Sequence, residues 1–293
     1  MDTTGMTELA CAIRMTATRL RREKRNKPPV VVRFDKPEAG HRPPASSIPV
    51  PGEASGADAA RLLEEHFAAR GELPAAVTVD ELGCFSLLDP AADGAGPPGR
   101  LCGCSAVVTG SAQGFGRGIA EQLAGEGASV VVADLNEELG RRCAEELNRD
   151  YGEGTALFSH ADVTDADSLE RMIVSTVGAF GGLDMFIANA GVLIAGPIEE
   201  MDERAFDLVT SVNYKAFFLC ARAAAGIMRR QHAFDNGHFM DIIQINSKSG
   251  LQGSNRNFAY AGSKFGGIGL VQSFAMELIR DNIKVNAICP GNF

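Results

Sequence analysis

Tyr260 and Lys264 stand four residues apart in a segment with helical periodicity, residues 258–280. At that spacing, both side chains lie on one face of a helix. A free tyrosine, with a pKa of about 10, is a poor acid or base at neutral pH. A neighbouring ammonium group favours the phenolate and moves that pKa toward the working range. The pair therefore predicts a general acid/base group, although such a pair is also an ordinary feature of a helix surface.

Ser247 follows an apolar run at residues 240–245. At the end of a strand, its hydroxyl could hold a substrate oxygen that the tyrosine protonates or deprotonates. Lys248 and Arg256 lie close by in the sequence and could offer positive charge to a phosphorylated substrate, or could simply be solvated side chains. These residues predict proton transfer to or from an oxygen atom.

A glycine-rich turn joins a β-branched run at residues 106–109 to a helical pattern. Gly110, Gly114 and Gly116 permit positive φ angles and leave room where phosphates approach the backbone. The helix that follows points its free N–H groups at those phosphates. The spacing T-G-x-x-x-G-x-G differs from the commoner G-x-G-x-x-G pattern. It predicts dinucleotide binding, but such a turn also lets a helix pack closely on a strand.

Asp134 follows a second apolar run, roughly 20 residues beyond the turn, where a carboxylate accepts hydrogen bonds from an adenosine ribose. A carboxylate there repels a 2′-phosphate, and no arginine or lysine is adjacent, which favours NAD over NADP. The alternative is a helix N-cap, which Asp134 or Asn136 could equally provide.

From residue 101 onward, apolar strands alternate with helical segments. This order predicts an α/β fold, a doubly wound parallel sheet of the Rossmann type covered on both faces. In such sheets, ligands bind beyond the carboxyl ends of the strands, where all these motifs fall. The expected strands are residues 106–109, 129–133, 156–159, 185–188, 240–245 and 284–288.

Together, the motifs make the chain from about Leu101 resemble the short-chain dehydrogenase/reductase family. The matching elements are residues 109–116, Asp162-Val163, Asn189-Ala190-Gly191, Asn213, Ser247, Tyr260-x-x-x-Lys264 and Pro290-Gly291. The resemblance implies an NAD cofactor and an alcohol or ketone substrate. It also implies that the cofactor is bound by Thr109, Gly110, Gly114, Phe115, Gly116, Asp134, Asp162, Val163, Asn189, Ala190, Gly191, Tyr260, Lys264, Pro290 and Gly291.

The same resemblance assigns the catalytic roles. Ser247 would bind the substrate oxygen, and Tyr260 would be the general acid/base. Lys264 would hold the nicotinamide ribose and lower the tyrosine pKa, and Asn213 would anchor a proton-relay water nearby. Asn189 and Asn213 could also cap backbone groups within the fold.

A narrower resemblance is carried by residues 113–120, 244–250 and 265–270. They are similar to sorbitol-6-phosphate 2-dehydrogenases and to the dehydrogenase half of bifunctional aldolase/dehydrogenases. This implies hydride transfer between a secondary alcohol of a polyol or sugar phosphate and its ketone, in a homo-dimer or homo-tetramer. The family continues beyond Pro290-Gly291 with a substrate-covering segment and one further strand, whereas this sequence stops at Phe293. We therefore expect a C-terminally truncated sheet without its last strand; the alternative function is an NAD-binding module without turnover.

The net charge of −9 argues against nucleic-acid binding. The sequence shows no signal peptide and no apolar run long enough to cross a bilayer. The seven cysteines are scattered without a C-x-x-C pair, which favours a reduced, cytoplasmic setting. Cys102 and Cys104 resemble half of a metal site, but no second pair completes it, so no metal is expected.

The first hundred residues carry no catalytic motif. Residues 1–57 contain a basic run (19–27) and many prolines, and we expect a poorly ordered segment there; a basic run can also bind nucleic acid or phosphate. Residues 58–100 predict a small α+β segment, with a helix at 58–71, a hairpin of strands 76–79 and 84–88, and a linker at 89–99. Residues 101–293 would form the NAD-binding domain.

Overall fold

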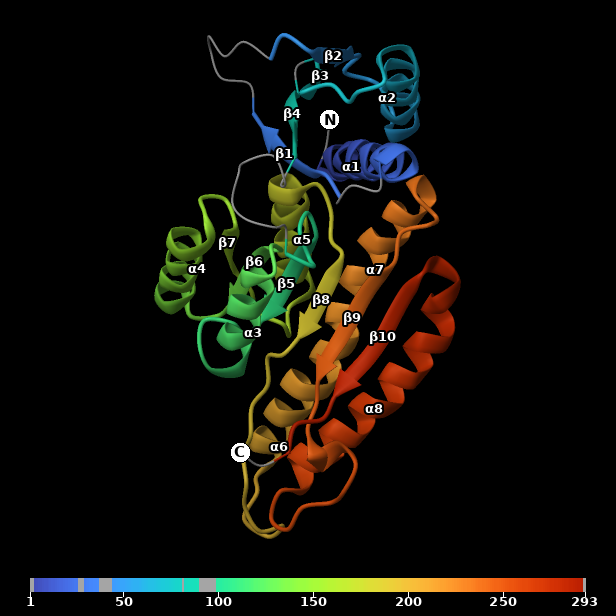
Figure 1. The fold of residues 1–293 in the computed structure, drawn as a ribbon. Coiled ribbons are helices and arrows are strands. Elements are labelled where there is room, and N and C mark those ends of the chain that lie inside the picture. Colours follow the sequence, from blue (N-terminus) through green and yellow to red (C-terminus); the bar gives the residue numbers. More distant parts are fainter. Residues whose placement is uncertain (1–2, 26–28, 37–43, 81, 90–98, 292–293) are drawn as a thin grey trace.

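Figure 1 shows the computed structural model, which describes residues 3–25, 29–36, 44–80, 82–89 and 99–291. These residues form two sheets with their helices. A small N-terminal unit lies at the end of the larger, parallel sheet from which the strands start. The arrows of β8, β9 and β10 point away from that unit, so the carboxyl ends of these strands lie at the far end of the molecule.

The larger sheet has the strand order β10-β9-β8-β5-β6-β7, and every pair in it is parallel. The order reverses between β5 and β8, which are neighbours in space although far apart in the sequence. All six expected strands are present, so the doubly wound parallel sheet is confirmed. They are β5 (Ser105–Thr109), β6 (Ser129–Asp134), β7 (Ala156–His160), β8 (Met185–Ala188), β9 (Met240–Ile245) and β10 (Ile283–Ile288).

Two separate cores show that helices cover both faces of this sheet. Val108 and Val132 lie in the core beneath α3 and α4, whereas Val107 and Val131 face the opposite core, beneath α5 and α7. This follows from the alternation of side chains along a strand. The helical elements of this part are α3 (Gly114–Gly125), α4 (Glu137–Tyr151), α5 (Ala166–Phe180), α6 (Glu203–Thr210), the π-helix η1 (Ser211–Lys215), α7 (Ala216–Phe234), η2 (Lys248–Gly250), α8 (Phe258–Leu278) and η3 (Ile279–Asp281).

The N-terminal unit is a four-stranded sheet of order β1-β4-β3-β2 with two helices. The expected hairpin is present, since β3 and β4 pair in antiparallel fashion. The predicted helix at 58–71 corresponds to α2, which begins with a capping box at Ser55 and ends at Gly71 in the left-handed conformation. The elements are α1 (Thr3–Arg25), β1 (Val31–Asp35), β2 (Ser47–Val50), α2 (Gly56–Arg70), β3 (Ala76–Val79) and β4 (Gly83–Leu88).

The expectation of poor order within residues 1–57 is wrong where the structure describes them. Residues 3–25 form α1, and Leu9, Ile13 and Met15 on it are at most 1% exposed. Residues 9–18 are buried on every side of this helix, which packs against α5, α7 and α2; none of these contacts can be inferred from the local sequence. Lys27, Pro28, residues 37–43 and the linker residues 90–98 lie outside the described residues.

Part of the basic run makes ion pairs within the chain. Arg19, Arg21 and Arg22 pair with carboxylates that lie far away in the sequence: Glu64, Asp89 and Asp235. These pairs explain why arginines at these positions belong to a packed helix. In the described part of the chain, no helix is long and apolar enough to cross a membrane.

Candidate active site

The carboxyl ends of β5 and β8 form the centre of the candidate site. This is the position where the strand order reverses, and it is where ligands bind in open α/β sheets. β5 continues into the glycine turn and α3, and β8 continues into Asn189-Ala190-Gly191.

Hydrogen bonds join these two segments. Asn189 donates through Nδ2 to the carbonyl oxygens of Thr109 (2.9 Å) and Gly110 (3.0 Å). The Thr109 hydroxyl oxygen accepts from the backbone N–H groups of Asn189 (3.0 Å) and Ala190 (3.1 Å). Gly110 has a φ of 64°, and a Cβ on it would lie 2.9 Å from the Ala190 Cα. Asn189 therefore binds backbone groups, as the alternative interpretation anticipated, and so fixes the shape of the turn.

The residues around the turn fit a dinucleotide. Gly114 has a φ of 59°, and a Cβ built on it would meet no atom within 4 Å, so the turn is open on that side. The side chain of Gln113, the N-cap of α3, makes no capping hydrogen bond. The N-terminus of α3 therefore keeps its favourable potential for an anion.

Asp134 stands at the end of β6 beside this turn. Its carboxylate accepts from the backbone N–H groups of Ala112 and Asn136, each at 2.9 Å. Asn136 provides the N-cap of α4, because its side chain accepts from the Leu139 N–H at 3.0 Å. The two interpretations of this segment thus separate: Asn136 caps the helix, and Asp134 faces the turn.

The next strand places Asp162 and Val163 close to Asp134. The N–H of Ala161 donates to the Asp134 carbonyl oxygen at 3.0 Å. The Asp162 carboxylate accepts from the N–H and the hydroxyl of Thr164, and Val163 is buried in the core. Both residues therefore stand at the same edge of the sheet as the glycine turn.

Ser247 lies just beyond β9, as expected. Its Oγ accepts from the N–H of Ser249 at 3.1 Å, which leaves the hydroxyl proton available to donate to a ligand. Asn246, which the sequence analysis missed, accepts from the Ser247 N–H at 2.8 Å and donates to the Lys264 carbonyl oxygen at 3.0 Å. It thereby fixes Ser247 relative to α8. The only signal for it is a polar residue adjoining an apolar strand.

Tyr260 and Lys264 lie in the first two turns of α8. The Lys264 Nζ stands 5.5 Å from the centre of the Tyr260 ring and donates to the Ile245 carbonyl oxygen at 3.0 Å. Lys264 is only 5% exposed, and burial lowers its pKa to about 8. At neutral pH this amine remains mostly protonated, so it presents a positive charge close to the tyrosine.

Asn213 lies in the π-helix η1, a distortion that is often found at functional sites. Its Oδ1 accepts from the Val192 N–H, and its Nδ2 donates to the Val192 carbonyl oxygen, both at 2.8 Å. Nδ2 also donates to the Ser263 hydroxyl oxygen at 3.2 Å. Asn213 thus holds the segment after β8 against α8, in agreement with the backbone-capping interpretation.

A cavity of about 230 Å³ brings many of the predicted residues together. A second cavity, of about 10 Å³, lies behind Lys264 and is also lined by Thr109, Val163, Ala190 and Asn213. Five predicted residues do not line the larger cavity but form the glycine turn or lie beside it: Gly110, Gly114, Gly116, Asp134 and Asp162. Leu193 lines it and was not predicted. The larger cavity is lined by Phe115, Asn189, Gly191, Val192, Leu193, Ile245, Asn246, Ser247, Tyr260, Lys264, Pro290 and Gly291.

Comparison with known proteins agrees with this geometry. The sequence model of the short chain dehydrogenases matches residues 105–293. The chain belongs to the short-chain dehydrogenase family. It is therefore an oxidoreductase of a family that uses nicotinamide cofactors, and the family predicted from the motifs is confirmed.

Individual relatives share more than a third of the matched residues with this chain. Trans-4-hydroxycyclohexanecarboxylate dehydrogenase of Sinomonas cyclohexanicum is 37% identical over 191 residues, which cover 64% of this chain and 71% of that protein. Sorbitol-6-phosphate 2-dehydrogenase of Escherichia coli is 37% identical over 187 residues, covering 64% and 70%. The crystal structure of sorbitol-6-phosphate 2-dehydrogenase from Erwinia amylovora superposes with a TM-score of 0.61 at 41% identity, covering 64% and 71%.

Proposed function

We propose that this protein is an NAD-dependent dehydrogenase that interconverts a secondary alcohol of a polyol or sugar phosphate and the corresponding ketone. The observation that carries the proposal is the single cavity in which Ser247, Tyr260 and Lys264 meet residues of the glycine turn and of the segment after β8. Groups able to transfer a proton, beside a turn with room for a dinucleotide, support this reaction.

Ser247, Tyr260 and Lys264 each have a different role in the proton transfer. The Ser247 hydroxyl donates a hydrogen bond to the substrate oxygen, and the Tyr260 phenolate takes the hydroxyl proton during oxidation. The buried Lys264 ammonium stabilises that phenolate by its charge. A bound nicotinamide ring supplies the hydride acceptor, and its ribose would be held by Tyr260 and Lys264.

Asp134 is the basis for proposing NAD. Two backbone N–H groups already orient its carboxylate, and no arginine or lysine forms an ion pair with it among the described residues. A carboxylate in this position accepts hydrogen bonds from the ribose hydroxyls and repels a 2′-phosphate.

Lys248 and Arg256 support a phosphorylated substrate. Both are exposed, and neither has an ion-pair partner in the part of the chain that the structure describes. The backbone N–H of Lys248 donates to the Pro290 carbonyl oxygen at 2.8 Å, which fixes this residue at the edge of the cavity. Two relatives named sorbitol-6-phosphate 2-dehydrogenase agree with this choice of substrate.

The test combines cofactor binding with turnover. NADH titration followed by fluorescence should show binding, and NADPH should bind at least about tenfold more weakly because of Asp134. Oxidation of sorbitol 6-phosphate by NAD should be detectable and should fall roughly 100-fold or more in Tyr260→Phe, with NADH affinity retained. Cofactor binding without any turnover would favour the alternative, a binding module; no affinity for either cofactor would refute the proposal.

We also propose that the protein is a cytoplasmic homo-oligomer. Apolar side chains on the outer faces of α7 and α8 are exposed, with Phe218 at 42%, Phe265 at 46% and Met276 at 82%. Pairing of these helices between subunits would cover them. Light scattering of the purified protein should therefore give a dimer or tetramer mass.

A further inference from the structure

Helix α1 packs against the amino ends of the parallel strands, at the opposite end of the sheet from the candidate site (Figure 1). It lies outside residues 105–293, the part that the family model matches. Arg14, near its middle, is fully buried with 0% exposure. A buried arginine is rare unless each of its N–H groups has a partner.

The partners of Arg14 come from three parts of the chain. Its Nε donates to the Val30 carbonyl oxygen at 3.1 Å, and its Nη2 donates to the Gly103 carbonyl oxygen at 3.1 Å. The Asp184 carboxylate takes two more bonds, at 2.5 Å from Nη2 and 3.3 Å from Nη1. This is a bidentate ion pair that joins the N-terminal unit to the dehydrogenase fold.

Asp184 in turn joins the starts of two strands. It stands just before β8, and its carboxylate accepts from the N–H (2.6 Å) and the hydroxyl (3.2 Å) of Ser105, the first residue of β5. The Asp184 N–H donates back to the Ser105 carbonyl oxygen at 3.0 Å. His238 Nε2 lies 2.7 Å from the other carboxylate oxygen.

The same two strands end at the glycine turn, where Thr109 and Asn189 are joined by hydrogen bonds. β5 has five residues, so Ser105 and Thr109 are about 13 Å apart along an extended, fully buried strand. Such a strand transmits a shift at one end to the other because close-packed neighbours leave it no room to adjust. The register of β5 on β8 is thus fixed at one end by Asp184 and at the other by Asn189.

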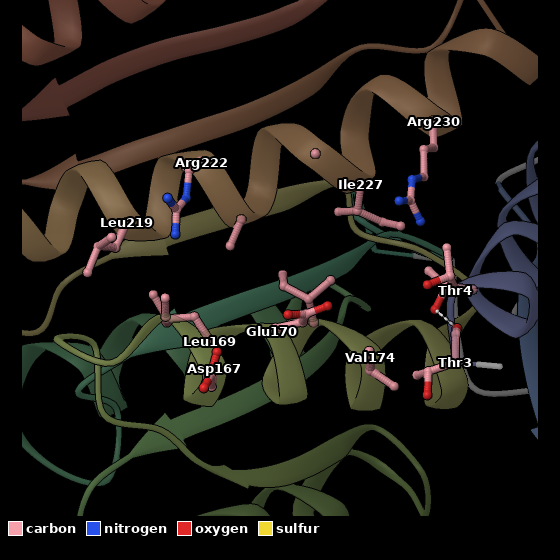
Figure 2. Close-up of a pocket in the computed structure, with 15 residues that line it drawn as sticks. Thr3, Thr4, Asp167, Leu169, Glu170, Val174, Leu219, Arg222, Ile227 and Arg230 are labelled. Carbon is pink, nitrogen blue, oxygen red and sulfur yellow. Dashed lines mark hydrogen bonds between the residues drawn. The ribbon is translucent and has the colours of Figure 1, made fainter.

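A further ion pair holds the C-terminal part of α1. Arg22 pairs with Asp235 at 2.7 Å, and the Asp235 side chain is 0% exposed. At the beginning of the helix, Thr3 and Thr4 line a cavity of about 340 Å³ between α5 and α7, opposite Val174, Ile227 and Arg230 (Figure 2). The ion pairs therefore attach the helix to the dehydrogenase fold at its middle and near its end.

We propose that Arg14 is a positioning residue of the cofactor site and that α1 and the glycine turn are energetically coupled through Asp184, β5 and β8. The proposal rests on the proposed function, since it requires NADH to bind at the turn. It predicts that NADH stabilises α1, with which it has no contact, and that loss of Arg14 weakens NADH binding.

Hydrogen exchange of the full chain with and without saturating NADH tests the coupling without any substitution. Slower exchange in residues 110–116, and in residues 9–17 by a larger factor than in residues 59–67 of α2, supports the proposal. Equal slowing in residues 9–17 and 59–67 reflects stabilisation of the whole fold by the ligand and overturns the coupling. Slower exchange in residues 110–116 alone overturns the coupling while leaving the proposed function intact. No change at residues 110–116 overturns both.

A matched pair of α1 variants tests the role of Arg14 itself. Arg14→Met should raise the Kd for NADH about tenfold and leave kcat at saturating cofactor nearly unchanged, because Ser247 and Tyr260 are held by β9 and α8. Arg19→Met removes a half-buried arginine of the same helix, which pairs with Glu64, and should leave the Kd unchanged.

Arg14→Lys covers the case in which Arg14→Met does not fold. It keeps the charge but loses the planar fork, and a Kd raised about threefold is expected. A wild-type Kd in a folded Arg14 variant would overturn the proposed role.

Discussion

Lys264 meets two opposing demands at the scale of a single residue. The proposed function requires its charge beside Tyr260, yet burial disfavours that charge and lowers the pKa of Lys264 from 10.5 to about 8. Between these two values the unfolded chain binds more protons than the folded one, so this group makes the protein more stable as the pH rises from 8 to 10.5. Below pH 8, keeping the buried ammonium costs about 3 kcal/mol.

Lys264→Met should reveal that cost. Relative to the wild type, the free energy of unfolding of the variant should be highest at pH 7, and its advantage should shrink by about 3 kcal/mol toward pH 10.5. Urea unfolding at a series of pH values measures this difference. A difference independent of pH would show that burial does not perturb Lys264.

Lys248 tests the choice of substrate. Lys248→Ala should lower kcat/KM for sorbitol 6-phosphate by roughly 10-fold or more, and for unphosphorylated sorbitol very little, because only the phosphate contacts the ammonium group. Lys284→Ala, which removes a lysine paired with Asp241 on β10, is the control. Equal losses with both substrates would rule out phosphate recognition by Lys248.

At the scale of elements, two glycines of the same turn should respond differently to substitution by alanine. Gly110 and Gly114 both have positive φ, but a Cβ on Gly110 would meet the Ala190 backbone, whereas one on Gly114 would meet nothing. Gly110→Ala should therefore destabilise the protein by roughly 2–4 kcal/mol, and Gly114→Ala by only about 1 kcal/mol. Thermal unfolding of the two variants checks these values.

For NADH binding, by contrast, we expect a large effect of the substitution at Gly114. Gly114→Ala, although nearly as stable as the wild type, is expected to weaken NADH binding at least about tenfold, because its methyl group enters the open side of the turn where phosphates would lie. Unchanged affinity in the folded variant would place the dinucleotide elsewhere.

The sequence predicted elements best where one strand or helix carries its own signal. The six parallel strands are short apolar runs, and Tyr260 and Lys264 share a helix, so local patterns suffice for both. Asn246 and α1 were not predicted, because each owes its role to partners on other elements that are distant in the sequence. Asn246 matters through Lys264, and the basic residues of α1 matter through Asp184 and Asp235.

At the scale of the whole molecule, one core runs through both units. It contains Leu9 and Ile13 of α1 together with Met172 of α5 and Met228 of α7. A shared core of this kind predicts a single cooperative unfolding transition. Fluorescence and circular dichroism should give coincident denaturation curves; two separate transitions would show that the N-terminal unit folds independently.

Breaking the Arg14–Asp184 pair should lower the free energy of unfolding of the whole chain. Burial raises the pKa of Asp184, but the charge of Arg14 and the hydrogen bonds from His238 and Arg14 outweigh it and hold this pKa well below its usual range. Arg14→Met leaves the buried carboxylate without its arginine partner, with only Ser105 and His238 as hydrogen-bond partners, and should cost about 3–5 kcal/mol. Adding Asp184→Asn should recover part of that loss in denaturant unfolding; a purely additive double variant would contradict the pairing.

The attachment of α1 also sets a practical limit on how the polypeptide can be shortened. A version begun at residue 105, where the family model begins to match, would lack Arg14, the arginine that pairs with Asp184, and would leave the apolar sides of α5 and α7 open to water. We expect such a product to accumulate as insoluble aggregate, however complete its catalytic residues. A shortened version of this oxidoreductase should therefore keep α1.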